Sequence, residues 1–279
     1  MTATAQIPNV TLNNGMTMPQ LGVGTFLVQD NVAECVAHAL RTGFRLIDTA
    51  QGYGNEKGVG EGIRLSGVPR KEIFLTTKIN TTEMRNGTVR ESIDKSLADL
   101  GVEYIDLMLI HWPVEGKVQE TWQIMEEYVE AGKIRAIGLS NFNPHHINSL
   151  LTYARIKPVV NQIEIHPYMT QYGPSGHSFA NGIQVESWGP LGQGKTQELD
   201  EPAIKAIAER HDKSPAQIIL RWHMQRGLVT IPRCDNPDYV KENIDIFNFE
   251  LTPAEMETIS GLNLNRRTFE RNDPDSFPW

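Results

Sequence analysis

The chain has 279 residues, of which 39% are hydrophobic, and its 34 acidic residues against 26 basic ones give a net charge of -8. This composition is that of an ordinary globular protein, and the acidic excess argues against general binding to nucleic acids or anionic membranes. Residues 1–9 lack a basic stretch followed by an apolar run, and no window approaches about 18 consecutive apolar residues. We therefore expect a cytoplasmic protein without an export signal or a membrane span.

The predicted elements begin with a short hairpin that turns at Asn13-Asn14-Gly15. After this hairpin, short β-branched runs alternate with longer amphipathic segments almost to the end of the chain. The runs predicted to be strands are Leu21–Phe26, Leu46–Ala50, Ile73–Ile79, Ile105–Trp112, Ile134–Asn141, Val159–His166, Ile183–Trp188 and Val229–Arg233.

The intervening segments have the apolar periodicity of helices, and several end at a glycine, the residue that most readily adopts the left-handed conformation after a helix. The predicted helices are Val32–Arg41, Lys57–Leu65, Thr88–Leu100, Val118–Glu130, His145–Ala154, Pro202–His211, Pro215–Gln225, Asp238–Phe247 and Pro253–Ile259. The segment Tyr168–Gly182 holds four glycine or proline residues, so it is expected to contain less helix than its counterparts.

Eight strands that alternate with helices predict an α/β protein with a (β/α)8 TIM barrel, because parallel strands need crossover helices and the ring closes at eight strands. The N-terminal hairpin and the last two helices would be additions to this barrel. No linker divides the chain, so residues 1–279 are predicted to form a single domain. An open, doubly wound sheet is the alternative.

In such a barrel the catalytic groups stand at the carboxyl ends of the strands. Strand two ends in Asp48, the following loop carries Tyr53, strand three ends in Lys78 and strand four ends in His111. A tyrosine is a poor acid at neutral pH, but an adjacent ammonium such as that of Lys78 lowers its pKa, and Asp48 would hold that ammonium charged. His111 would orient a carbonyl oxygen as a donor. Taken together, the four residues predict proton delivery to an oxygen atom.

Each of these residues also has a plainer interpretation on its own. Asp48 could cap the next helix, His111 could be a buried histidine bonded to backbone, Lys78 could be a surface cation and Tyr53 a pocket aromatic. Their position at neighbouring strand ends favours the functional interpretation.

Several long motifs surround these residues and follow one another along nearly the whole chain. They are Gly43–Ala50 with Tyr53–Glu56, Thr77-Lys78, Ile105–Pro113, Gly138–Phe142 and Asn161–Pro167. In this order the motifs resemble those of the aldo-keto reductases. The run Glu186–Gly194 is similar to that of the bacterial 2,5-diketo-D-gluconate reductases.

The resemblance implies that Tyr53 is the general acid, that Lys78 and Asp48 tune it, and that His111 orients the carbonyl. A reduced nicotinamide would supply hydride, and no metal would be needed. The positions that match the nicotinamide site of the family are Gly24 and Thr25 at the pocket lip, Ser140, Asn141 and Gln162 for the carboxamide, and Trp188 for stacking on the ring. Those that match the rest of the cofactor site are Leu191, Gly192 and Gln193 over the pyrophosphate, Arg233, Cys234 and Tyr239 near the 2′-phosphate, and Glu242 and Asn243 near the adenine.

The 2′-phosphate region departs from the family pattern. Many members have Pro-Lys-Ser and a later Arg, whereas this chain has Arg233, Cys234 and Tyr239 at those positions. Asp235 and Asp238 add negative charge nearby. The resemblance therefore implies NADPH as cofactor, with NADH as an open alternative because Tyr239 replaces the usual arginine.

The substrate pocket is predicted to be open and tolerant. Phe26, Asn80 and Trp112 match its walls, but Asn80 stands where an aromatic residue is usual, and the segment after His111 is short. The substrate would be a small carbonyl compound, and a keto-sugar acid such as 2,5-diketo-D-gluconate is one candidate. A monomer is what the resemblance implies.

Two other functions compete with this interpretation. Gly189–Thr196 fits the Gly-x-x-x-x-Gly-Lys-Thr pattern of nucleotide hydrolases, but the polar residues after it do not predict the helix that should start at Lys195. A regulatory subunit that binds the cofactor without turnover is the other alternative, and the intact catalytic set argues against it.

Metal and disulfide sites are not predicted. Cys35 and Cys234 are expected to be free thiols in a reducing compartment, since their spacing resembles neither a disulfide framework nor a Cys-x-x-Cys motif. His145, His146 and His166 are metal-binding residue types, but the sequence shows no partner at ligand spacing from them.

Overall fold

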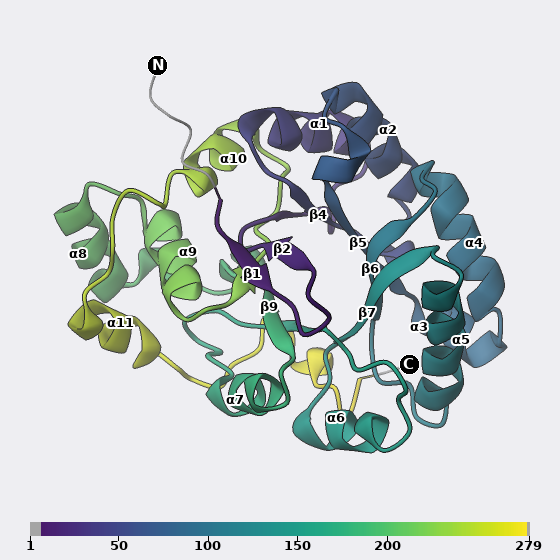
Figure 1. The fold of residues 1–279 in the computed structure, drawn as a ribbon. Helices are drawn as coiled ribbons and strands as arrows, with labels where there is room; N and C mark the ends of the chain where they lie inside the picture. The colour runs from purple at the N-terminus through teal and green to yellow at the C-terminus, as the bar shows by residue number, and fades with distance from the viewer. Residues whose placement is uncertain (1–6, 278–279) are drawn as a thin grey trace.

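The computed structural model describes residues 7–277 and contains a barrel of eight parallel strands preceded by an antiparallel hairpin (Figure 1). The hairpin consists of β1 (Asn9–Thr11) and β2 (Thr17–Pro19), on either side of the predicted turn. The barrel strands are β3 (Val23–Gly24), β4 (Leu46–Asp48), β5 (Phe74–Ile79), β6 (Ile105–Ile110), β7 (Ile134–Ser140), β8 (Val160–Glu164), β9 (Gln184–Trp188) and β10 (Val229–Thr230).

The strands pair in chain order from β3 to β10. Two parallel bridges, from Leu21 to Thr230 and from Gly24 to Arg233, join the first strand region to the last. The predicted (β/α)8 barrel is therefore confirmed, whereas the alternative of an open sheet is wrong.

Helices surround the barrel on its outside (Figure 1). They are α1 (Val32–Thr42), α2 (Glu56–Ser66), α3 (Thr81–Asn86), α4 (Val89–Leu100), α5 (Val118–Glu130), α6 (Pro144–Leu151), α7 (Tyr172–Ala180), α8 (Pro202–His211), α9 (Pro215–Gln225), α10 (Pro237–Ile244) and α11 (Pro253–Ser260). Short 3-10 turns occur at η1 (Gln51–Tyr53), η2 (Arg70–Glu72), η3 (Gly192–Gly194), η4 (Glu198–Asp200) and η5 (Glu270–Asn272). The nine predicted helices are confirmed within a few residues at each end. Within the described part of the chain, no helix is long and apolar enough to cross a membrane.

Apolar side chains fill the barrel interior and the layer between strands and helices. Leu46, Phe74 and Val160 belong to the interior cluster, which the hairpin residue Met18 also joins. Side chains on a strand alternate between its two faces, so residues two or four positions after these apolar ones also point into the barrel. These later residues are the polar Asp48, Lys78 and Gln162. The interior is thus apolar toward the amino ends of the strands and polar at their carboxyl ends.

The segment Tyr168–Gly182 contains the helix α7, which is no shorter than several of its counterparts, so the prediction of less helix there is wrong. A glycine inside a helix costs about 1 kcal/mol, which made the segment look irregular. However, a Cβ at Gly173 or Gly176 would meet nothing within 4 Å, so these glycines cause no strain in the helix. Ser175 and Ser178 of the same helix are buried. Packing against α6 and β9 outweighs the low intrinsic propensity.

Helix α2 uses three glycines to approach its neighbours closely. A Cβ at Gly58 would stand 2.3 Å from a methyl carbon of Val32 in α1, and one at Gly60 would stand 2.2 Å from the carbonyl oxygen of Leu100 at the end of α4. Gly62 likewise faces the backbone of α1. Side chains at these positions would push α2 away from α1 and α4. The glycines therefore fix the position of α2, which directly follows the turn that carries Tyr53.

Candidate active site

The four predicted catalytic residues meet at the carboxyl end of the barrel. The Lys78 ammonium donates to both carboxylate oxygens of Asp48, at 2.6 and 2.8 Å, and to the carbonyl oxygen of Thr49 at 2.9 Å. It also lies 3.4 Å from the Tyr53 hydroxyl, and the rings of Tyr53 and His111 pack edge to face with their centroids 5.8 Å apart. The residues thus form a chain from Asp48 through Lys78 to Tyr53, with His111 beside the phenol.

The electrostatics of this chain are set by burial and by the Lys78–Asp48 pair. Lys78 is fully buried, which disfavours its charged form, but Asp48, Tyr53 and Glu186 together outweigh this effect and raise the pKa of Lys78. Burial raises the pKa of Tyr53 more than the Lys78 ammonium lowers it. The predicted lowering by Lys78 is present, but the larger effect of burial was not predicted, because the sequence showed the neighbouring charge and not the burial.

His111 is neutral at physiological pH. Burial and the nearby Lys78 charge lower the pKa of His111 to about 3. A neutral imidazole still carries one N–H donor. His111 can therefore donate a hydrogen bond to an oxygen beside Tyr53 without adding a positive charge.

Asn55 holds the turn that carries Tyr53. The sequence did not show this role, although Asn55 lies in the motif Tyr53–Glu56. The Asn55 side chain donates to the carbonyl oxygens of Thr25 and Val28, at 3.0 and 2.7 Å, and accepts from the Thr49 hydroxyl at 2.9 Å. These bonds connect the loop after β4 to the lip after β3. Asn55 thus fixes the position of the turn that carries Tyr53 relative to Lys78.

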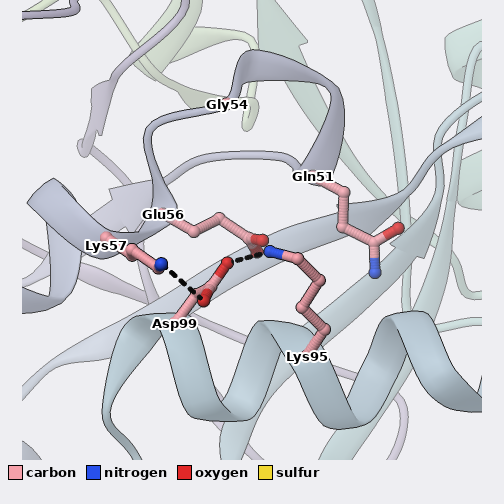
Figure 2. Close-up of a pocket in the computed structure, with 6 residues that line it drawn as sticks. All are labelled: Gln51, Gly54, Glu56, Lys57, Lys95 and Asp99. Atoms are coloured by element: carbon pink, nitrogen blue, oxygen red, sulfur yellow. Dashed lines mark hydrogen bonds and ion pairs between the residues drawn. The ribbon is translucent and has the colours of Figure 1, made fainter.

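A polar cavity of about 220 Å³ lies between this turn and helix α4 (Figure 2). Its lining residues are Gln51, Gly54, Glu56, Lys57, Lys95 and Asp99. Lys57 and Lys95 both pair with Asp99, and the Glu56 carboxylate accepts from Thr77 at 2.7 Å and from Ser96 at 3.2 Å. None of the four catalytic residues lines this cavity. Its side chains instead join α2, β5 and α4 behind the catalytic turn.

The residues matched to the nicotinamide site offer the complement of a primary carboxamide. Asn141, in the left-handed conformation with φ 63°, donates to the His111 carbonyl and to Ser140 Oγ, both at 3.0 Å. The Ser140 hydroxyl keeps its own proton to donate. Gln162 uses its amide nitrogen on the carboxyl groups of Asp48 and Glu186, so its oxygen is left to accept. One donor and one acceptor fit the C=O and NH2 of a carboxamide.

The indole of Trp188 stands at the end of β9 beside this donor set. Its Nε1 donates to Asn141 Oδ1 at 2.8 Å, which fixes the ring plane. The side chain is half-buried. A flat, anchored aromatic face beside a carboxamide-binding set is suited to stacking on a nicotinamide ring.

The phosphate side of the predicted cofactor site is less complete. Leu191, Gly192 and Gln193 lie in and before the turn η3, which follows Trp188. The Arg233 guanidinium pairs with Asp235 at 2.6 Å, and Tyr239 is 58% exposed on α10. The Cys234 thiol, in contrast, is fully buried in the core beside Cys35. A thiol at this depth faces α1 rather than a phosphate, so of the three predicted residues only Arg233 and Tyr239 stand at the surface.

The two residues predicted near the adenine lie on α10. The Glu242 carboxylate accepts from the Ser214 hydroxyl at the start of α9, and Asn243 is buried. Both cysteines are free, as predicted, and a hydrogen bond that the Cys234 thiol donates to Cys35, together with burial, raises the pKa of Cys234 well above its usual range.

The Gly189–Thr196 pattern does not form a phosphate-binding loop of the nucleotide hydrolase type. Such a loop leads directly into a helix at its lysine. Here Lys195 follows the 3-10 turn η3, and the next α-helix begins only at Pro202. The Lys195 ammonium instead lies 5.8 Å from the ring centre of Phe269.

The predicted substrate walls surround Tyr53 only in part. The Phe26 ring lies 5.0 Å from that of Tyr53, and the Trp112 ring stacks at 3.8 Å on Phe277 near the C-terminus. The sequence did not predict this covering of Trp112. Asn80 caps helix α3, with its Oδ1 accepting from the Thr81 N–H at 3.0 Å. It thus has a structural role that the sequence did not show, because the short helix α3 was not predicted.

The three histidines considered as metal-binding residue types have carboxylate partners that the sequence did not show. His145 and His146 lie 3.2 and 3.5 Å from Asp275. However, His146 Nδ1 accepts from the Asn143 N–H, so its proton is on the Nε2 that faces Asp275, and this tautomer cannot bind a metal there. His166 is fully buried between Glu164 and Glu198, at 3.3 and 2.5 Å, which hold its ring as an ion pair.

Comparison with known proteins identifies the family to which this chain is related. The model of the aldo/keto reductase family matches residues 14–264. The chain belongs to the aldo/keto reductase family. This reductase is 46% identical over 260 residues to a glyoxal reductase of Bacillus subtilis, covering 92% of this chain and 94% of that protein. It is 45% identical to an uncharacterized oxidoreductase of the same organism, over 96% of this chain and 97% of that protein.

A solved structure of an aldo-keto reductase from Bombyx mori, in complex with NADP, has the same fold. Its TM-score to this reductase is 0.91 at 36% sequence identity, and 98% of each chain is covered. The fold and the family assigned from the sequence motifs are thereby confirmed.

Proposed function

We propose that this reductase converts an aldehyde or ketone to an alcohol with NADPH as hydride donor, and that Tyr53 delivers the proton. The observation that carries the proposal is the buried chain Asp48–Lys78–Tyr53 beside a donor set that complements a carboxamide. The bound dihydronicotinamide supplies the hydride. The remaining work of proton transfer, orientation and charge stabilisation falls to the residues of the chain.

Each catalytic residue has a distinct task in this proposal. Tyr53 donates its proton to the carbonyl oxygen as negative charge develops there. The Lys78 ammonium stabilises the resulting phenolate, and Asp48 keeps Lys78 charged and pointed at the phenol. The neutral His111 N–H aligns the carbonyl oxygen with the Tyr53 hydroxyl.

For the cofactor, the proposal includes NADPH as the main donor and NADH as a usable one. Arg233 supplies a cation for a 2′-phosphate, but its pairing with Asp235 at 2.6 Å must be broken or shared for this contact. Tyr239 adds no positive charge. The ratio of kcat/KM for NADPH and NADH tests this point, and a strong preference for NADPH would rule out the use of NADH.

For the substrate, the proposal is a small carbonyl compound, with keto-sugar acids such as 2,5-diketo-D-gluconate and dicarbonyls among the candidates. The similarity of Glu186–Gly194 to the diketogluconate reductases and the glyoxal reductase relative support these classes. The free thiols of Cys35 and Cys234 support a reducing, cytoplasmic location. We further propose a monomer of one domain, which sedimentation of the purified protein would test.

The substitution Tyr53→Phe tests the function. It removes the acid and keeps the ring, so we expect turnover to fall by about 10²–10⁴-fold with cofactor affinity retained. Turnover is followed by nicotinamide absorbance with a diketogluconate, a keto ester and an aromatic aldehyde, and cofactor binding by quenching of tryptophan fluorescence. Unchanged turnover in Tyr53→Phe would contradict the assignment. Tight cofactor binding without turnover of any carbonyl by the wild-type protein would favour a regulatory subunit.

A further inference from the structure

A second carboxyl group, that of Glu186 on β9, is buried beside the catalytic residues. Glu186 is fully buried and stands in register with Gln162 on β8. The amide nitrogen of Gln162 donates to Glu186 Oε2 at 2.8 Å and to Asp48 Oδ2 at 2.8 Å. One amide group therefore joins the catalytic carboxylate to a second carboxyl group that the family resemblance does not assign to catalysis.

The ammonium of Lys78 has no proton left for Glu186. It already has four acceptors for its three protons: both oxygens of Asp48, the carbonyl of Thr49 and the hydroxyl of Tyr53. Among residues 7–277, Oε1 of Glu186 has no hydrogen-bond partner. A fully buried carboxylate with a single donor is costly, so the geometry favours the neutral acid.

The residues around Glu186 also favour its neutral form. Its register partners on β8 and β10 are the uncharged residues Gln162 and Val229, and the charged or titratable groups that act on it or through it are Asp48, Lys78 and Tyr53. Burial and then the Asp48 charge raise the pKa of Glu186 to about 8, against the opposing effects of Gln162 and Lys78. At neutral pH the network therefore holds one carboxylate, one ammonium and one neutral carboxyl group.

We propose that Glu186 is a positioning residue that acts through Lys78 and Tyr53: its uncharged carboxyl group permits proton donation by Tyr53, and its ionisation weakens that donation. The inference rests on the proposed function of Tyr53 as general acid. A negative charge at Glu186 raises the pKa of both Tyr53 and Lys78. It therefore disfavours the phenolate that must form as Tyr53 gives up its proton.

The pH profile of carbonyl reduction tests this role in the Glu186→Gln variant, whose amide keeps the shape of the neutral acid but cannot ionise. We expect kcat/KM of the wild-type enzyme to fall above about pH 8, and the variant to lack this step. The ratio of variant to wild-type kcat/KM should therefore rise above pH 8, by at most about tenfold per pH unit, until Glu186 is fully ionised in the wild type. Superimposable profiles would overturn the proposal.

The matched control is Glu126→Gln. Glu126 is also a buried glutamate, but it lies on α5 and pairs with Arg155 outside the barrel. Its loss affects stability without changing the charge near Tyr53, so the control should keep the wild-type pH profile. A shift in the control equal to that in Glu186→Gln would overturn the specific role of Glu186.

A stability measurement tests the ionisation without any turnover. Because the pKa of Glu186 is raised on folding, the native wild-type protein holds a proton that the unfolded chain has lost, and its stability falls as the pH rises from about 5 to 8. The melting temperature of Glu186→Gln relative to wild type should therefore increase over this range. A constant difference would overturn the neutral carboxyl group, whereas a rising difference without turnover of any carbonyl would leave it in place and contradict the proposed function instead.

Should Glu186→Gln fail to fold, an infrared titration of the wild-type protein replaces both measurements. A protonated buried carboxyl group gives a C=O stretching band that is lost on ionisation. We expect one such band to disappear between pH 7 and pH 9, and a spectrum without a titrating band in this range would overturn the proposal.

Discussion

The substitution Lys78→Met isolates the stability contribution of the buried ion pair. The side chain of Lys78 is fully buried and that of Asp48 is 3% exposed, and two of the ammonium bonds go to Asp48 at 2.6 and 2.8 Å. Without the ammonium, the one side-chain donor left to the Asp48 carboxylate among residues 7–277 is Gln162, at 2.8 Å. Removing one partner of such a pair costs about 3–5 kcal/mol of unfolding free energy, so a loss of this size is expected at pH 7.

The pH dependence of this loss follows from the protonation of Asp48. Burial raises the pKa of Asp48 even beside Lys78, and this pKa rises further once the cation is gone, so the native variant binds a proton that the unfolded chain lacks. The variant therefore loses stability as the pH rises above the unfolded value near 4, by at most about 1.4 kcal/mol per pH unit. Between pH 5 and pH 7 the deficit of Lys78→Met should grow by up to about 2.7 kcal/mol.

Urea unfolding followed by circular dichroism at pH 5, 6 and 7 measures these differences. The double variant Asp48→Asn/Lys78→Met is the control, because it has no ionisable group at either position and its deficit should not vary with pH. The reasoning would be refuted if Lys78→Met were within about 1 kcal/mol of wild type at pH 7, or if its deficit were equal at pH 5 and pH 7.

Two further predictions concern the loop after β9 and the acid stability of the fold. In Gly192→Ala the new Cβ would stand 1.6 Å from Thr196 Oγ1, so we expect the loop to shift and the affinity for the cofactor to fall. The control Gly194→Ala has a similar positive φ but no clash, so it should retain more of this affinity, measured by fluorescence quenching. Equal losses of affinity in the two variants would contradict the role of the clash. For Glu255, bonds from Thr252, His211 and Arg210 outweigh burial and lower its pKa to about 2. Its stabilisation is thus present above pH 4.5 and lost as the pH falls toward 2, so Glu255→Gln should melt lower at pH 7 and show a shallower decline toward pH 3, whereas parallel melting curves would contradict this.

The catalytic set could be predicted because it depends on a simple geometric rule. Asp48 and Lys78 end neighbouring parallel strands, and the carboxyl ends of such strands share one edge of the barrel. Period-2 alternation then directs both side chains inward. No knowledge of long-range packing is needed to bring these two residues together.

The remaining features depend on contacts that the sequence does not show. Glu186 reaches Asp48 through Gln162 across the barrel interior, from strands far apart in the chain. Burial outweighs the Lys78 charge at Tyr53, which only the packed structure can show. Helix α7 forms despite its glycines because its neighbours hold it, an effect that local propensity cannot reveal.

The seam of the barrel has a consequence for how the chain is made. Leu21 and Gly24 complete their pairing only with Thr230 and Arg233, so a ribosome must synthesise most of the protein before the ring can close. Until then the nascent sheet has two open edges, at β3 and at the last strand completed, and open parallel edges invite pairing with other chains. The two-residue strand β3 leaves little of the first edge exposed while the ring is open. The shortness of β3 thus limits the edge that stays open longest during synthesis, while the few bridges at the seam suffice to close the barrel.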